Sequence, residues 1–320
     1  PKPVTTPAPP VSRPAPPVAA PTAPANPITS PVLAPVSLPA PAPLPAGERS
    51  AWAEPALVNP VTVALSDTNR NLTLSPSQDY VLVCPPGQLA LTYALSVWGG
   101  HNVELENCDF NITTADWAAH LKNQTGTLYL RNVHFGGAQL TGGIQLQEPG
   151  ATTVVMRDVL FDTVHGSYTT NHAECLQTWS GPQRLLIDGL TCPTQYQGLF
   201  LLPNQWDSTT VETAWDLRNI SIDDTDGAYA LWLGDVTGSP ANQAAAALST
   251  WNVSNVFVDP NPTRTWTGWW LWPKPSTGDT TWSGVQAGVP AGGPFVTAIA
   301  GGATGADATA DPGALAGEQS

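Results

Sequence analysis

The middle of the chain repeats one pattern of apolar and polar positions. Two apolar residues spaced by two precede a polar residue and a bend residue, and further apolar residues follow one and three positions later. The pattern recurs as VELENCDF (103–110), LYLRNVHF (128–135), VVMRDVLF (154–161), LLIDGLTC (185–192), WDLRNISI (215–222) and WNVSNVFV (251–258). Because alternation with period two puts apolar side chains on one face of an extended chain, each copy is predicted to be a strand.

Every copy breaks at a residue that suits a corner. The bend residues are Asn107, Asn132, Asp158, Gly189, Asn219 and Asn255. Asn, Asp and Gly tolerate the left-handed or turn conformations that a corner needs. A unit this short cannot cover its own apolar face, so neighbouring units must stack and share a core. The sequence therefore predicts an all-β fold, a parallel β-solenoid. The regular helical pattern of βαβ units is missing, which disfavours a doubly wound sheet.

A second alternating segment follows each bend, after a small residue. The small residues are Ala118, Gly143, Cys175, Gly198 and Ala230. Residues predicted to point inward are Ala119, Ile144, Leu176, Leu199 and Leu231, with Leu121, Leu146, Thr178, Leu201 and Leu233. The outward row is His120, Gln145, Gln177, Phe200 and Trp232, with Lys122, Gln147 and Trp179 beside it. Stacked strands lie roughly 4.8 Å apart, so these outward residues should form one stripe. Amides and aromatic faces suit a glycan chain.

The third coil carries an enlarged loop, Asp162 to Ala173. His165 and His172 fall in it, and Glu174 follows directly. Imidazole titrates near neutral pH and a carboxylate can tune it, so these three residues are the candidate general acid and base. A second interpretation is that they hold the loop through hydrogen bonds. A metal site is a weaker third, because the spacing matches no zinc signature.

Charged residues recur just before the bends. The row reads Glu106, Arg131, Arg157, Asp188, Arg218 and Ser254. One interpretation is an arginine strip that binds uronate or sulfate groups, with Arg157 contacting the ligand. The other is a stacked ladder of ion pairs that selects the register, for which Asp188 between two arginines is suited.

The four cysteines predict two disulfides. Cys84 and Cys108 are separated by about one coil, and Cys175 and Cys192 flank the exit of the long loop and the next corner. We predict these two bridges, although four cysteines allow three pairings. The tryptophan-rich run TWTGWWLW (265–272) and the segment from Glu54 to Cys84 are predicted to cap the two ends, since an open solenoid end needs a cap.

Composition divides the chain into three parts. Half of the 34 prolines precede Ala46, and such a segment cannot bury enough apolar surface to order itself. We predict a disordered or semi-rigid spacer at 1–47, a solenoid domain at 48–289 and a Gly- and Ala-rich tail at 290–320. The net charge of −14 without any basic run argues against nucleic acid as a partner. No apolar run is long enough to span a bilayer, and paired cysteines favour export.

At the level of a family, these repeats resemble the right-handed parallel β-helix proteins of the pectate-lyase-like superfamily. The segments GSYTTNHAECLQTWSGP (166–182) and TQYQGLFLLPNQ (194–205) resemble a narrower group of secreted bacterial β-helix proteins of unassigned activity. The resemblance covers roughly Leu72 to Val285 and adds Tyr196 and Gln197 to the candidate binding residues. It implies a polysaccharide ligand. The resemblance also implies calcium. The sequence itself lacks an acidic cluster on consecutive coils, so from the residues we predict no cofactor and no metal.

The leading hypothesis is a secreted, monomeric β-helix that binds a polysaccharide and cleaves it as a lyase or a glycoside hydrolase. The alternative is a cell-surface or adhesin-type module that binds glycans without cleaving them, or a purely structural solenoid. A structure separates them: catalytic side chains must converge within roughly 4 to 8 Å on one substrate bond.

Overall fold

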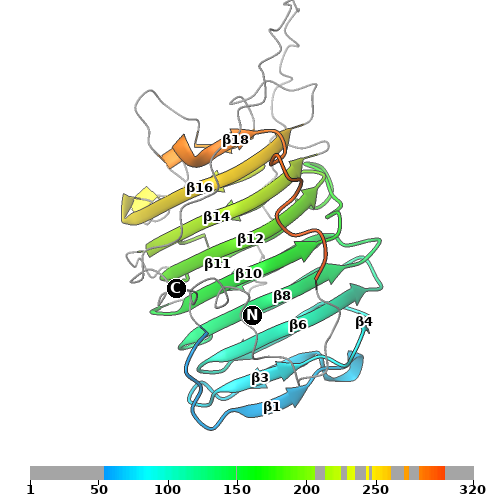
Figure 1. Ribbon diagram of the computed structural model, residues 1–320. Helices are drawn as coiled ribbons and strands as arrows, with labels where there is room; N and C mark the ends of the chain where they lie inside the picture. The colour runs from blue at the N-terminus through cyan, green and yellow to red at the C-terminus, as the bar shows by residue number, and fades with distance from the viewer. Residues whose placement is uncertain are drawn as a thin grey trace, which may run out of the picture. The chain divides into compact units, whose positions relative to one another are not determined.

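The structure, a computed structural model, describes residues 54–148, 150–205, 213–224, 229–234, 243–244, 247–260, 270–273 and 281–299. Its strands form two sheets in which every pairing between described strands is parallel (Figure 1). Neighbours in each sheet are not consecutive in the sequence, because the chain alternates between the two sheets as it advances by one coil. The predicted all-β solenoid is confirmed as a parallel β-helix.

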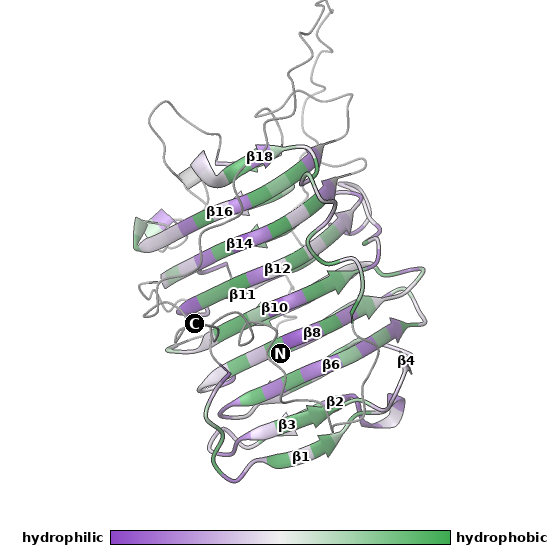
Figure 2. Cartoon of the chain, in the orientation of Figure 1, coloured by the Kyte–Doolittle hydropathy of each residue, from purple (hydrophilic) through white to green (hydrophobic). Residues whose placement is uncertain are grey.

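The first sheet has ten strands and the second has eight. The first contains β1 (Val61–Ala64), β3 (Tyr80–Val83), β4 (Gln88–Leu91), β6 (Val103–Ile112), β8 (Thr127–Gly136), β10 (Thr153–Phe161), β12 (Arg184–Thr194), β14 (Thr213–Asp224), β16 (Ser249–Pro260) and β18 (Val285–Ala287). The second contains β2 (Asn71–Leu74), β5 (Leu95–Gly99), β7 (Trp117–Lys122), β9 (Gly142–Gln147), β11 (Leu176–Ser180), β13 (Leu199–Leu201), β15 (Leu231–Leu233) and β17 (Leu271–Trp272). Figure 2 shows apolar and polar residues alternating along the strands of the first sheet.

All six predicted bend residues adopt positive φ. The angles are 52° at Asn107, 53° at Asn132, 54° at Asp158, 82° at Gly189, 52° at Asn219 and 55° at Asn255. Strand pairing is interrupted at each bend, so every long strand has a leg before it and a leg after it. We call the outer surface of the legs before the bends the first face, that of the legs after the bends the second face, and that of the second sheet the third face.

Side chains at the bends link one coil to the next. Asn132 donates a hydrogen bond through Nδ2 to Asn107 Oδ1 at 2.7 Å, and Asn255 does the same to Asn219. At Gly189 a Cβ atom would lie 2.7 Å from Asp158 Oδ1. A side chain there would force the neighbouring carboxyl group to move, and glycine adopts the positive φ without the strain of a Cβ atom.

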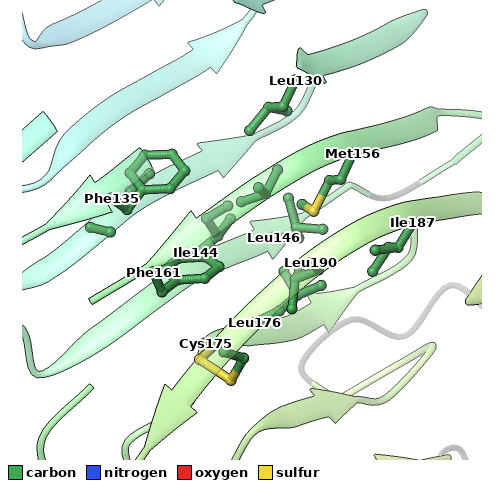
Figure 3. Packing of buried hydrophobic residues seen from close by; sticks show 14 of the residues in the cluster. Leu130, Phe135, Ile144, Leu146, Met156, Phe161, Cys175, Leu176, Ile187 and Leu190 are labelled. Carbon is green, nitrogen blue, oxygen red and sulfur yellow. A yellow bond between two sulfur atoms is a disulfide. The ribbon is translucent and has the colours of Figure 1, made fainter. Parts of the chain in front are cut away.

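The predicted inward rows form the core. Ile144, Leu146 and Leu176 are buried from the second sheet, and they face Met156 and Leu190 of the first sheet (Figure 3). Phe135 stacks between Phe110 and Phe161, with ring centroids 5.3 Å and 5.5 Å away. Stacking of the same residue type at one position in three coils removes large apolar surfaces from water without breaking the repeat.

Both predicted disulfides are present. Cys84–Cys108 joins neighbouring coils with a Cα–Cα distance of 5.5 Å, and Cys175–Cys192 joins the residue before β11 of the second sheet to β12 of the first sheet with a Cα–Cα distance of 5.9 Å. The yellow bond in Figure 3 marks the second of these.

The ends of the solenoid lie partly outside the described residues. The segment from Glu54 to Cys84, predicted as a cap, contributes β1, β2 and β3 to the two sheets. Trp266 and Trp269 lie outside the described residues, whereas Trp270 is buried. The spacer predicted for 1–47 and the tail from residue 300 also lie outside them, although residues 290–299 are described.

Replacing Asn132 should separate the two roles of a bend residue. Asn132→Ala loses both the bond to Asn107 and a side chain that tolerates positive φ, whereas Asn132→Gly loses only the bond. We expect the alanine variant to be less stable than the glycine variant by about 1 kcal/mol in denaturant unfolding, although glycine is ordinarily the worse residue in a strand. Equal stability of the two variants would show that the left-handed conformation adds no constraint.

Candidate functional site

The third face carries one uninterrupted row of outward residues. Strand register pairs each member with the next across seven strands. In order they are Ser96, His120, Gln145, Gln177, Phe200, Trp232 and Trp272. The row therefore runs from polar and amide side chains at β5 to aromatic rings at β17. We call it the stripe.

Beside the stripe, a lysine lies between two tryptophans. Lys122 Nζ is 4.5 Å from the ring centroid of Trp179 and 5.7 Å from that of Trp98. The register shifts between Thr178 and Ser180, so Trp179 occupies an irregular position in β11. Burial lowers the pKa of Lys122. Gln147 pairs with Lys122 in the neighbouring strand, which adds an amide next to the cation.

Hydrogen bonds hold the amides of the stripe in place. Trp179 donates through Nε1 to Gln177 Oε1 at 2.9 Å, and Gln177 Nε2 donates to Gln205 Oε1 at 3.2 Å. His120 has a side-chain hydrogen bond with Gln145, and burial is the main cause that lowers its pKa. An imidazole with a lowered pKa is neutral at physiological pH and can accept a proton.

A second row lies at the corner where the chain enters the third face. Trp117 pairs with Gly142, and Glu174, Gln197 and Tyr229 hold the equivalent position in the sequence, two residues before Leu176, Leu199 and Leu231. Its members are Trp117, Gly142, Glu174, Gln197 and Tyr229. Ring contacts of Trp117 with His120 at 6.2 Å and of Tyr229 with Trp232 at 5.0 Å show that the ends of the row lie on the same side as the stripe.

Two side chains of the corner row are buried with unsatisfied oxygens. Glu174 is 2% exposed and Gln197 is 3% exposed. Among the described residues, neither Glu174 Oε2 nor Gln197 Oε1 has a hydrogen-bond partner. Burial raises the pKa of Glu174 to about 8. Its carboxyl group is therefore protonated at neutral pH and can donate a proton.

The described contacts of the long loop place His172 beside two tyrosines. His172 is exposed, and its ring lies 6.0 Å from Tyr168 and 5.1 Å from Tyr196. No hydrogen bond or ring contact within this described loop joins His165, His172 and Glu174 to one another. The structure thus brings His172 to Tyr196, another predicted site residue, and the shared catalytic role of His165, His172 and Glu174 stays a prediction.

An asparagine fixes the base of the loop. Asn171 Nδ2 donates to the carbonyl oxygens of Thr141 and His165, at 2.7 Å and 2.8 Å. The backbone N–H of His165 donates to Leu140 O at 2.7 Å. These bonds agree with the interpretation that polar groups hold the loop, although the residue that does so is Asn171 and not a histidine.

The arginine row lies on the first face, away from the stripe. Its predicted register is confirmed, with Arg157 paired to Arg131 on one side and Asp188 on the other. Arg131 donates to both oxygens of Glu106, at 2.9 Å and 2.8 Å, and Arg157 bonds the hydroxyl of Tyr129. Arg157 was predicted to bind substrate, but the other predicted binding residues do not share its face. The pairing of Arg131 with Glu106 supports the ion-pair interpretation.

The second face contains a cluster that the sequence reasoning missed. His134 Nδ1 lies 2.9 Å from Asp109 Oδ1, and His134 Nε2 lies 3.1 Å from Asp162 Oδ1. The hydrogen bond with Asp162 is the largest cause that raises the pKa of His134, and burial opposes it. Asp109 and His134 each follow a bend by two residues, so the repeat itself could have identified this pair.

Neither a metal site nor a membrane-spanning helix is found in the described part of the chain. No group of three or more His, Cys, Asp or Glu side chains there is arranged to hold a metal ion. None of the helices described is long and apolar enough to cross a membrane. Comparison of the chain with protein-family models, curated proteins and solved structures finds no match.

Glu174→Gln should change how stability depends on pH. The folded state holds the Glu174 proton up to about pH 8, whereas the unfolded chain releases it near 4.5. The contribution of Glu174 is therefore complete below pH 4.5 and is lost as pH rises through 8, by up to about 1.4 kcal/mol per pH unit. We expect the stability of Glu174→Gln relative to the native protein to increase between pH 5 and 8 in denaturant unfolding.

The control for this comparison is Gln147→Asn, which alters the same face without changing an ionisable group. Its free energy of unfolding should follow the native pH dependence. If Glu174→Gln also followed the native curve, the carboxyl group would be ionised in the folded protein.

Proposed function

We propose that the protein binds a polysaccharide along the stripe of the third face and cleaves it there. The observation that supports this most directly is the unbroken register of the stripe over seven strands. At about 4.8 Å per step the row is roughly 29 Å long, which suits a chain molecule better than a small one. The amides of Gln145 and Gln177, which are 6% and 9% exposed, are the hydrogen-bonding groups that we propose for hydroxyl groups, and the half-buried rings of Phe200 and Trp232 are the proposed apolar platforms.

The tryptophans beside Lys122 combine aromatic platforms with a polar group in one place. Trp98 is about half exposed, so the face of a sugar ring can stack on it. Lys122 adds a cation that can meet a hydroxyl or an acidic group of the ligand. In the part of the chain that the structure describes, Lys122 forms no ion pair, so its charge is available to a ligand.

For cleavage, Glu174 is the candidate proton donor. A protonated carboxyl group next to the stripe can transfer its proton to the leaving oxygen of a glycosidic bond. The partner base accepts a proton from water in a hydrolase or from a sugar carbon in a lyase. His172, two residues earlier, and the neutral His120 of the stripe are the candidates for this role, with His165 as a supporting residue.

The setting that we propose is extracellular or at the cell surface. Two disulfides suit an oxidising compartment, and the repeats resemble secreted proteins of the pectate-lyase-like superfamily. We propose a monomer, because one chain presents the whole stripe.

A second candidate function is glycan binding without cleavage, as in an adhesin. The deep burial of Glu174 and the separate surroundings of His172 favour it. The stripe serves both functions, so the two candidates share a binding site and differ only in product formation.

Binding should depend on the tryptophans next to Lys122. We expect Trp98→Ala and Trp179→Ala each to weaken binding to the best ligand of a polysaccharide panel by about tenfold or more, about 1.4 kcal/mol, because a stacking platform is lost. Affinity electrophoresis or calorimetry measures this. Val83→Ala, which removes apolar surface outside the third face, should bind as the native protein does. If both tryptophan variants bound as the native protein does, the ligand would bind outside this face.

Product analysis decides between the two candidate functions. An enzyme should release either unsaturated ends, the mark of a lyase, or saturated reducing ends, the mark of a hydrolase. Glu174→Gln should then lose product by about 100-fold or more while its binding remains, because general acid catalysis of this kind contributes at least that factor. Binding without product in the native protein would establish the non-catalytic alternative.

A further inference from the structure

A strip of outward residues on the first face is buried. Strand register aligns Glu104, Tyr129, Val155 and Leu186 on four neighbouring strands. The residues before and after each of them belong to the core, so by alternation these four point away from it. Nevertheless their exposed fractions are 6%, 1%, 1% and 4%. Tyr129, Val155 and Leu186 form an apolar cluster separate from the core of the solenoid.

On the first face, the burial of outward residues is confined to this one row. Two residues further along the same strands, the side chains of Glu106 and Arg131 are 17% and 25% exposed. A broad partner surface would cover both rows, because they lie side by side. A single extended segment that follows the solenoid axis covers only one.

The second face shows such a segment in place. Thr191 and Ser221 point outward there and are 9% and 6% exposed. The backbone N–H of Val296 donates to Thr191 Oγ1 at 3.0 Å, and that of Phe295 donates to Ser221 Oγ at 3.1 Å. Figure 1 shows this orange segment running from β18 down across the strands. The segment that contains Phe295 and Val296 thus covers outward residues of two neighbouring strands in this molecule.

The other end of the described chain begins beside the buried strip. Burial of the carboxyl group and the charge of Glu54 raise the pKa of Glu104 to about 7, so Glu54 lies near the first member of the strip. The strip spans three strand spacings, roughly 14 Å. An extended chain advances about 3.3 Å per residue, so four or five residues cover it. The residues directly before Glu54 are Arg-Ser-Ala-Trp-Ala, and Trp52 is their large apolar side chain.

We propose that residues 49–53 dock along this strip, with Trp52 on the apolar cluster of Tyr129, Val155 and Leu186. Docking ties the proline-rich chain to the first face. The spacer then leaves the solenoid from a fixed point, and the stripe of the third face stays open.

Trypsin provides a direct test. Lys2 and Arg13 are each followed by proline, so the bond after Arg49 is the ordinary tryptic site within the first 53 residues. In the native full chain this bond should resist cleavage. Trp52→Ala should raise the rate of cleavage after Arg49 by at least tenfold, as followed by mass spectrometry, because proteolysis reports the fraction of undocked segment. Trp52 lies outside the solenoid strands, so its replacement leaves their packing intact.

A second variant and a control complete the test. Val155→Asp, which puts a charge into the strip, should raise the same rate, whereas Trp98→Ala, which removes an exposed aromatic ring of the third face, should leave it at the native value. Equal cleavage of the native chain and Trp52→Ala would overturn the proposal. A native dimer in sedimentation that becomes monomeric in Val155→Asp would also overturn it, by assigning the strip to a second copy of the chain.

Discussion

Stacking in register is the constraint on which this structure depends. A parallel coil can bury its apolar side chains only if the next coil repeats the same alternation at the same height, and that requires the chain to turn at the same residue in every coil. The left-handed bend residues meet this requirement, and the amides of Asn107, Asn132, Asn219 and Asn255 also bond from one coil to the next. One conformational requirement, met once per coil, thus aligns the core, the disulfides and the surface rows together.

Register also explains why the three faces differ. Each outward row contains one residue from every coil. When the same residue type recurs at that position, its side chains form a continuous strip on the surface. The first face combines ion pairs, such as Arg131 with Glu106, with the buried apolar cluster of Tyr129, Val155 and Leu186. The second face carries the His134 cluster and the segment that contains Phe295. The third face gathers amides and aromatic rings, which is why it is the face that we connect to a ligand.

Much of this arrangement could be predicted from the sequence because it is local. Alternation and a bend at one residue place Ile144 in the core and Gln145 outside without any knowledge of distant contacts, and the repeat then predicts the partners of Cys84 and Cys175. The corner of the long loop could not be predicted in this way. Cys175 and Leu176 are adjacent and both belong to the core, so alternation fails there and cannot show that Glu174 is buried.

The same limit applies to groups that depend on other coils. Asp162 belongs to the long loop in the sequence, but its carboxylate bonds His134 of the preceding coil, a contact that the spacing within the loop cannot show. The buried state of Tyr129 likewise depends on what covers it and not on its own strand.

The residue type at Glu174 bears on whether the third face only binds a glycan or also cleaves it. A glutamine has nearly the same shape and would fill the same space without an ionisable group. A carboxyl group that is 2% exposed and whose Oε2 has no hydrogen-bond partner among the described residues makes the fold less stable as pH rises, because the folded state holds a proton that the unfolded chain releases. Packing alone therefore gives no reason for an acid at this position. In the function that we propose, cleavage would use a donor that stays protonated at neutral pH, whereas binding alone does not require one. The proposed cleavage accounts for the residue type, whereas the 2% exposure of the side chain is the observation that favours binding alone.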